Sequence, residues 1–259
     1  MIVEQLRITG QEEIAPRIYR MTLEGDSVQT MTEPGQFVHV KVSDGIDPLL
    51  RRPISICDVS QDKQELTIIY RAEGRGTRLL AAKKTDDTLD VLGPLGQGFP
   101  LDSLQKGSTA LLVGGGVGIP PLYYLAKKLV KRGVNVRTIL GFRQSEDIFL
   151  QKEFRELGDI IVTTEDGSKG VHGFVTDAMN QAEKPYDSFF TCGPVPMLRA
   201  VKAAAASDGF ISLEERMGCG VGACLACVCE ASDATSQEGK KYRKICSDGP
   251  VFRAGEVVI

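Results

Sequence analysis

The chain has 259 residues, which exceeds one typical domain and predicts two domains with a small third module. Its formal net charge of -3 is small and its charged residues are interspersed, so neither nucleic acid nor an anionic membrane surface is expected as a partner. The first residues lack a basic stretch followed by an apolar one, and no apolar run reaches about 18 residues, so a soluble, cytoplasmic protein is expected.

Residues 1–100 are expected to form an antiparallel β-barrel domain. Short alternating or β-rich segments follow one another at regular spacing, separated by Gly, Pro and Asp turn signals such as Pro34-Gly35. The six expected strands cover residues 3–9, 17–23, 36–42, 53–56, 66–71 and 88–92.

Two stretches of this barrel are candidates for binding an anion. Arg51 and Arg52 precede Pro53, which restrains the backbone, so the guanidinium groups are suited to gripping a pyrophosphate. The segment 74–77, Gly-Arg-Gly-Thr, opens an expected helix through residue 82, whose free backbone amides suit a phosphate. The alternative is that these basic residues are simply solvated at strand ends.

Residues 101–212 are expected to form a doubly wound α/β domain with a parallel sheet and helices on both faces. Expected strands cover 110–113, 135–142, 159–163 and 188–192, and expected helices cover 122–131, 148–157, 174–181 and 196–206. The glycine-rich loop after the first strand predicts a pyrophosphate site, because ligands of such sheets bind at the carboxyl ends of the strands. The candidate residues are Gly114, Gly115, Gly116 and Gly118.

The loop matches a dinucleotide-binding fingerprint only in part. Ile119 stands where a third glycine or alanine is expected, and the acids that follow the second strand, Glu146 and Asp147, come late for a ribose ligand. The choice between NADH and NADPH therefore stays open, and a tight turn without any ligand is the alternative. Cys192 ends the strand 188–192 and could lie against a nicotinamide ring, although a free cysteine there is usually a small buried apolar residue.

The cysteines near the C-terminus carry the most specific pattern. Cys219, Cys224 and Cys227 follow C-x4-C-x2-C on a glycine-rich loop, and Cys246 lies further along. This is the spacing of a plant-type 2Fe-2S cluster, whereas structural zinc sites usually present two short C-x2-C pairs. Cys229 could also approach such a cluster, but a second segment is needed to close the site, so Cys246 is the expected fourth ligand. The seven cysteines fit a reducing compartment in which thiols bind metals.

RRPIS at 51–55, GRGT at 74–77, GGGVGIPPL at 114–122 and TCGPVPM at 191–197 resemble, in this order, the ferredoxin–NADP reductase superfamily. That superfamily joins an FAD-binding barrel to a nicotinamide-nucleotide domain. With EERMGCGVGACLACVC at 214–229 added, the chain more closely resembles the electron-transfer subunits of NAD-dependent (class 1B) dihydroorotate dehydrogenases over essentially its whole length.

The resemblance implies FAD, a 2Fe-2S cluster and NAD(H) as bound groups. A flavin suits this set because NADH gives two electrons at once as hydride, whereas an iron–sulfur cluster takes them singly. The implied FAD-binding residues are Arg52, Pro53, Ile54, Ser55, Ile69, Tyr70, Arg71, Gly76 and Thr77. The implied cluster ligands are Cys219, Cys224, Cys227 and Cys246, and Cys192 would lie near the transferred hydride.

The expected organisation is then a barrel at 1–100, an NAD-binding domain at 101–212 and a cluster-binding lobe at 213–259. The lobe is too short for an independent ferredoxin domain and is expected to pack on the nucleotide domain. Glu214 and Glu215 are expected to be solvated charges, although a role in positioning the flavin is the alternative. No role is assigned to His39 or His172.

The resemblance also implies a partner, an FMN-containing dihydroorotate dehydrogenase catalytic subunit of pyrimidine biosynthesis. A heterotetramer with two copies of each chain would be expected. Two alternatives remain open. The chain could be a reductase subunit of a hydrogenase, a sulfite reductase or a ferredoxin-dependent transhydrogenase, or it could be a non-catalytic redox sensor whose cluster controls a protein contact.

Overall fold

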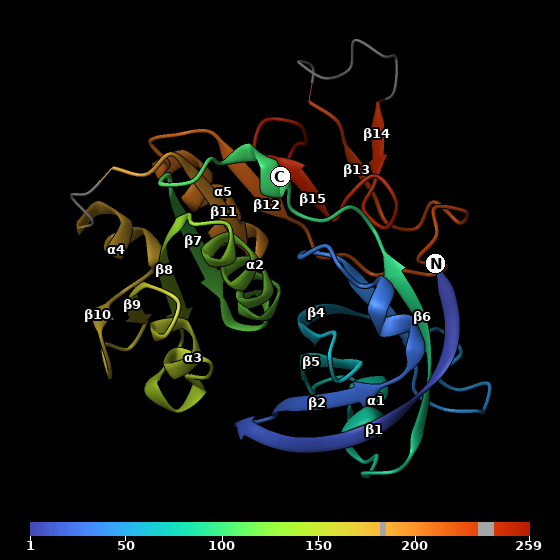
Figure 1. The fold of residues 1–259 in the computed structure, drawn as a ribbon. Helices are drawn as coiled ribbons and strands as arrows, with labels where there is room; N and C mark the ends of the chain where they lie inside the picture. Colours follow the sequence, from blue (N-terminus) through green and yellow to red (C-terminus); the bar gives the residue numbers. More distant parts are fainter. Residues whose placement is uncertain (182–184, 233–240) are drawn as a thin grey trace.

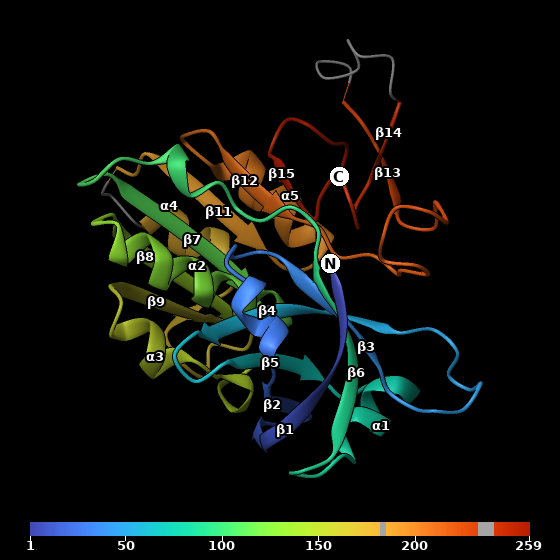
Figure 2. The ribbon, with the colours of Figure 1, turned by 45° about the vertical axis from the view of Figure 1, so that its right-hand side comes forward.

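The computed structural model of the chain describes residues 1–181, 185–232 and 241–259. Figure 1 shows a barrel drawn in blue and teal beside an α/β unit drawn in green to orange. The C-terminal residues, in orange and red, lie above the barrel and beside the sheet in both Figure 1 and Figure 2. Among the described residues, no helix is long and apolar enough to cross a membrane.

The N-terminal unit is the expected antiparallel barrel, closed in the order β1-β2-β5-β4-β3-β6. Its strands alternate between apolar residues that fill the interior and residues that face outward, the period that a half-buried strand requires. A short helix, α1, follows β5 at the segment where the Gly-Arg-Gly-Thr sequence predicts one. The bounds are β1 Ile2–Ala15, β2 Ile18–Glu24, β3 Phe37–Lys41, β4 Arg52–Ser60, β5 Glu65–Arg71, β6 Thr88–Leu95 and α1 Arg75–Ala81.

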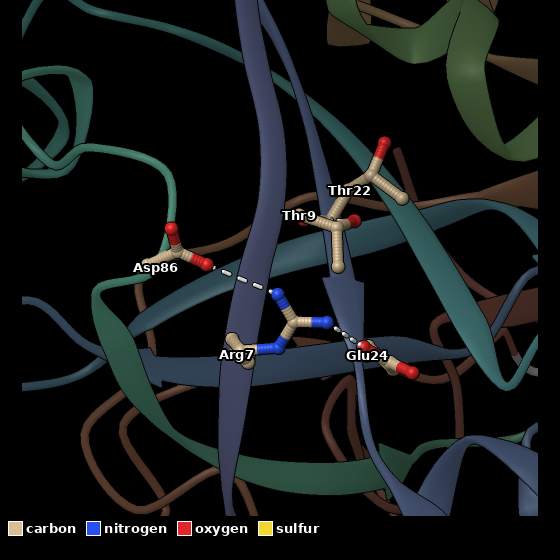
Figure 3. Close-up of polar contacts among 5 residues, drawn as sticks. All are labelled: Arg7, Thr9, Thr22, Glu24 and Asp86. Atoms are coloured by element: carbon tan, nitrogen blue, oxygen red, sulfur yellow. Dashed lines mark hydrogen bonds and ion pairs between the residues drawn. The ribbon is translucent and has the colours of Figure 1, made fainter.

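Charged side chains link the outer ends of the barrel strands (Figure 3). Arg7 on β1 pairs with Glu24 on β2 and, at 3.0 Å, with Asp86 in the turn before β6. Thr9 donates its hydroxyl to the backbone oxygen of Thr22 at 3.3 Å. These groups are exposed to water, so they contribute little to stability and mainly favour the observed strand register.

The second unit is a seven-stranded sheet in the order β10-β9-β8-β7-β11-β12-β15. All its strands are parallel except β15, which runs antiparallel to β12. The sequence predicts the strands that become β7, β8, β9 and β11, but it does not predict β10, β12 or β15. The bounds are β7 Thr109–Gly115, β8 Asn135–Phe142, β9 Asp159–Thr164, β10 Val171–His172, β11 Ser188–Cys192, β12 Gly209–Ser212 and β15 Val251–Arg253.

Helices cover both faces of this sheet, as expected for a doubly wound fold. Residues of α2 and α3 pack with one set of sheet residues, and residues of α4 and α5 pack with the alternate set. On β7, for example, Leu112 belongs to the first core and Leu111 and Val113 belong to the second. The helices are α2 Ile119–Lys131, α3 Gln151–Arg155, α4 Val175–Gln181 and α5 Val195–Ala204, and 3-10 turns occupy η1 Asp26–Thr30, η2 Leu101–Ser103, η3 Gly116–Gly118 and η4 Ser145–Asp147.

The barrel and the α/β unit meet along β4 and α2. Lys127 on α2 contacts both carboxylate oxygens of Asp58 on β4, at 2.7 and 2.6 Å. Tyr124, also on α2, donates its hydroxyl to the buried backbone oxygen of Met31 at 3.1 Å. These buried and half-buried contacts fix the orientation of the two units, which places the end of β5 beside the glycine loop after β7.

The C-terminal lobe packs on both the barrel and the α/β unit. The sequence led us to expect packing on the nucleotide domain only. Its hairpin joins β13, Val228–Glu230, to β14, Tyr242–Lys244. Met217 and Ile245 of the lobe are buried in the same core as Phe37 and Leu95 of the barrel and Phe252 of β15. The lobe therefore packs on the outer face of the barrel and supplies the last strand of the sheet, β15, and the expected boundary at residue 213 stays a prediction.

Candidate functional site

A cavity of about 630 Å³ opens at the carboxyl ends of β7, β8, β9 and β11. One wall is formed by the glycine-rich loop and by Gly193 and Pro194 after β11. The opposite end carries charged side chains after β8 and β9, namely Arg143, Asp147 and Glu165. This is the crevice in which doubly wound sheets bind ligands, and its volume suits a nucleotide.

Glycine is required at the loop because other segments approach its backbone closely. A Cβ on Gly115 would lie 2.5 Å from Met197 Sδ, and a Cβ on Gly118 would lie 2.4 Å from the carbonyl oxygen of Cys192. Gly116 has a φ of +52°, which favours glycine. Gly115, Gly116 and Gly118 line the cavity, whereas Gly114 packs against Ile119, 2.8 Å from where its Cβ would be.

Arg71 and Glu214 reach the same cavity from outside the nucleotide domain. Arg71 ends β5 of the barrel, and its Nη2 lies 3.5 Å from where a Cβ on Gly116 would be. The side chain of Glu214 is exposed and lines the cavity. The surrounding protein partly removes water from its carboxyl and so raises its pKa, whereas the positive charge of Arg71 lowers that pKa. Whether Glu214 is a solvated charge or positions the flavin stays a prediction, and so does the role of Glu215, which is exposed and accepts the backbone N–H of Arg216.

The structure brings the backbone of Cys192 to the glycine loop, but its side chain is fully buried. Cys192 pairs with Gly114 across β11 and β7, and it is absent from the described residues that line the cavity. Burial, together with the charge of Glu214, raises the pKa of its thiol. The role of Cys192 near a hydride stays a prediction.

The residues expected at the flavin come together on three adjacent segments, β4, β5 and α1. Arg52 lies over Gly76, where a Cβ would be 2.3 Å from its Nε, so the guanidinium and the start of α1 share one surface. Thr77 Oγ1 accepts the backbone N–H of Gly74 at 3.1 Å. Ile54, Ile69 and Tyr70 are buried in the protein cores, so these three can offer a ligand mainly their backbone.

The two neighbouring arginines have different surroundings. Arg51 is held inside the structure: Nη2 pairs with Asp90 Oδ1 at 2.7 Å, and Nη1 donates to the backbone oxygens of Asp90 and His39. Arg52 donates only to the carbonyl oxygens of Leu50 and Arg51 among the described residues. Because Arg52 has no carboxylate partner there and Gly76 leaves room beside it, this residue fits a pyrophosphate and Arg51 does not.

Backbone amides of the cluster-binding loop, residues 217–229, point at the cysteine sulfurs. Cys219 Sγ accepts N–H groups from Val221 at 3.4 Å, Ala223 at 3.3 Å and Cys224 at 3.4 Å. Burial alone would raise the pKa of Cys219, but these amides outweigh it and lower the pKa to about 6. A sulfur that is already stabilised as thiolate suits a metal ligand.

The four expected ligands form two pairs. Cys224 Sγ accepts the N–H of Cys219 at 3.4 Å, and Cys227 Sγ accepts the N–H of Cys246 at 3.4 Å. Within the described chain, no three Cys, His, Asp or Glu side chains converge on one metal position. Two pairs of thiols suit a cluster with two irons, each of which takes two protein ligands.

Cys246 reaches the cluster-binding loop from a second segment, whereas Cys229, the last residue of that loop, lies in β13. Cys246 Sγ accepts the N–H of Gly222 at 3.1 Å, which joins the second segment to the loop. Cys229 lies opposite Arg243 in the β13–β14 pair, and burial raises its pKa to about 11. The geometry favours Cys246 as the fourth ligand.

Comparisons with known proteins identify two domain families in the chain and near full-length relatives. The iron–sulfur cluster binding domain of dihydroorotate dehydrogenase B matches residues 214–258, and the oxidoreductase NAD-binding domain matches residues 112–203. The chain is 54% identical over 257 residues to the dihydroorotate dehydrogenase B (NAD(+)), electron transfer subunit of Bacillus mycoides strain KBAB4, covering 99% of this chain and 98% of that one. The corresponding subunit of Bacillus cereus strain B4264 is also 54% identical, with the same coverage.

Solved structures show the same architecture. An NADH-dependent reduced ferredoxin-NADP oxidoreductase matches with a TM-score of 0.85 and 32% identity, over 98% of this chain and 90% of that one. A ferredoxin NADP+ reductase from Neisseria gonorrhoeae matches with a TM-score of 0.66 over 78% of this chain and 89% of that one. At 15% identity the second match concerns the fold alone.

Proposed function

The chain belongs to the family of dihydroorotate dehydrogenase B electron transfer subunits, and on that premise we propose that it carries electrons between NAD(H) and a dihydroorotate-oxidising catalytic subunit. The observation that carries the proposal is the arrangement of two sites around one barrel edge. The cavity for a dinucleotide is lined by Arg71 at the end of β5, and the loop that carries three of the four thiols packs on His39 at the outer face of β3. An oxidoreductase that converts paired electrons into single ones needs these two sites close together.

FAD supplies the conversion between two-electron and one-electron chemistry, and a 2Fe-2S cluster supplies one-electron transfer. Arg52 and the start of α1 at Gly76 and Thr77 would bind the FAD pyrophosphate, because a free guanidinium and backbone amides favour an anion. Cys219 with Cys224, and Cys227 with Cys246, would each hold one iron. The amides directed at Cys219 stabilise its thiolate.

The nucleotide would lie with its pyrophosphate on Gly115, Gly116 and Gly118 and its adenosine toward Arg143 and Glu165. Arg71 links this cavity to the flavin segments, since it ends β5 and lines the cavity. Glu214 lines the same cavity, and the positive charge of Arg71 favours its ionised carboxylate. NAD(H) is the nucleotide favoured by the names of the relatives at 54% identity.

The partner is a catalytic subunit, as the name of the relatives implies. We propose that this subunit contains FMN and that two copies of each chain form a heterotetramer in the cytoplasm, acting in pyrimidine biosynthesis. The seven free cysteines support a reducing compartment. The cluster-binding loop supports a docking role, because Val221 and Leu225 expose apolar side chains beside the cysteines.

A second candidate function rests on the 32% identity with an NADH-dependent reduced ferredoxin-NADP oxidoreductase. Co-purification of the chain with its partner protein distinguishes the two candidate functions. The favoured function predicts a bound partner that contains FMN, and a complex that reduces NAD+ with dihydroorotate. A partner without FMN and a complex inactive with dihydroorotate would support the second function, and a protein that does not reduce artificial acceptors with NADH would support a redox sensor.

A further inference from the structure

His39 is a fully buried histidine between the barrel and the cluster-binding loop. On β3, Val38 and Val40 belong to the barrel interior, so the alternation of the strand directs His39 to the outer face. That face is covered by the C-terminal lobe, and the side chain is 0% exposed. The sequence offers no sign of this contact, because His39 and the loop lie far apart in the chain.

The imidazole packs directly on the loop that carries the first cluster ligand. A Cβ on Gly220 would lie 2.6 Å from His39 Nδ1, and Gly220 has a φ of +74°. The backbone of His39 pairs with Pro53 of β4, and the backbone oxygen of His39 accepts a hydrogen bond from Arg51 Nη1 at 3.2 Å. His39 is therefore a direct link between the strand that carries Arg52 and the loop that carries Cys219.

Both ring nitrogens of His39 lack a hydrogen-bond partner among the described residues. The backbones of Cys219 and Arg51 lie near the ring, but neither meets it at hydrogen-bonding geometry. A neutral imidazole carries one N–H donor and one acceptor nitrogen. A buried polar group without a partner is destabilising, so a further acceptor is expected at this position.

We propose that His39 is a positioning residue for the transfer of electrons between flavin and cluster, with its ring N–H directed at the sulfurs of the cluster that the loop holds. This inference rests on the proposed function. A cluster with four thiolate ligands is an anion, and it offers the acceptor that the buried ring lacks. Hydrogen bonds to cluster sulfurs are among the factors that set reduction potential.

The electron balance gives the expected direction. Oxidation of one NADH to NAD+ would release two electrons and one proton, and a 2Fe-2S cluster held by the four cysteines would accept those electrons one at a time. Each one-electron reduction would add one negative charge to the group that the loop holds, and an N–H donor from His39 would stabilise that charge. The ring keeps its own proton throughout. Loss of the donor should therefore make the cluster harder to reduce.

The test compares two variants of the full chain. His39→Phe keeps a ring of similar volume and removes both nitrogens, whereas His39→Asn keeps an N–H donor near the Nδ1 position. His172→Phe, on the exposed edge strand β10, controls for the substitution. For each protein we would measure iron and FAD content, thermal unfolding and the cluster midpoint potential by redox titration followed by electron paramagnetic resonance. Anaerobic stopped-flow mixing with NADH would time FAD bleaching and cluster reduction separately.

We expect His39→Phe to retain iron and FAD. At a fixed potential the ratio of reduced to oxidised cluster should fall about tenfold, which corresponds to a midpoint potential lower by about 59 mV for a one-electron couple. Cluster reduction should slow while FAD bleaching keeps its rate, and His39→Asn should recover most of the wild-type potential. A wild-type potential in folded, loaded His39→Phe would overturn the inference, as would an equal shift in both variants. If the wild-type chain binds no FAD or no cluster, the proposed function itself fails.

Discussion

Gly118→Ala is the sharpest test of the nucleotide site, because the added methyl group meets only backbone. Its Cβ would lie 2.4 Å from the carbonyl oxygen of Cys192 and 2.5 Å from the amide nitrogen of Gly193, where ordinary contact begins at 3.4 Å. The end of β11 and the glycine loop must therefore separate by about 1 Å, and overpacking of this kind costs about 1–3 kcal/mol.

For a chain of this size that cost should lower the midpoint of thermal unfolding by about 2–12 °C. The displaced loop lines the cavity, so the dissociation constant for NADH should rise about tenfold or more, while FAD content is unchanged. Gly10→Ala is the matched control, because nothing lies within 4 Å of its Cβ, and it should shift stability by no more than about 0.5 kcal/mol. Wild-type NADH affinity in Gly118→Ala would refute the assignment of this loop to the nucleotide.

Further predictions concern the cluster, the flavin and the barrel. Cys224→Ser should abolish the visible absorption of the cluster, while NADH still reduces FAD; loss of FAD reduction in the folded variant would contradict separable sites. Compared without FAD, Arg52→Met should keep the wild-type unfolding midpoint although it no longer binds FAD. Arg51→Met should still bind FAD but have a lower midpoint, because it removes the partner of the half-buried Asp90 carboxylate at a cost of about 1 kcal/mol. Glu4 accepts the backbone N–H of Ser27 at 2.8 Å; burial raises its pKa, but the hydrogen bonds lower it on balance. Wild type should therefore be more stable than Glu4→Gln above pH 4.5, by under about 1 kcal/mol, and the difference should vanish as the pH falls through the lowered pKa, measured by thermal melts at pH 7 and pH 3.

Local patterns were sufficient for the elements whose signals lie within a few residues. The alternating strands of the barrel, the glycine-rich turn before α2 and the cysteine spacing are each set by neighbours in the chain. The strands β12 and β15 were missed because they contain four and three residues, too few for a period to be recognised. β15 also joins the sheet by pairing with a strand about 40 residues earlier, which no local pattern encodes.

The roles of individual charged residues depended on contacts distant in sequence. Arg51 and Arg52 are equivalent in the sequence, but Asp90 holds only the first of them. Glu214 has no distinguishing sign in the sequence, but in the fold it lines the same cavity as Arg71. These three-dimensional partners decide which group is free to bind a ligand, and the sequence alone does not contain them.

The cluster-binding lobe illustrates how a short segment can hold a cluster rigidly. Cys227 and Cys246 are buried, at 2% exposure each, in a core that also contains Phe37 and Leu95 of the barrel and Leu111 of β7. Most of the buried residues of this core lie outside residues 214–258. A segment whose apolar residues pack into the core of two neighbouring domains needs no separate core of its own. This explains why the cluster-binding lobe can be shorter than an independent domain. The same packing makes the position of the cluster relative to the barrel a property of the whole chain, so a change on the barrel face, as at His39, can reach the cluster without touching a ligand.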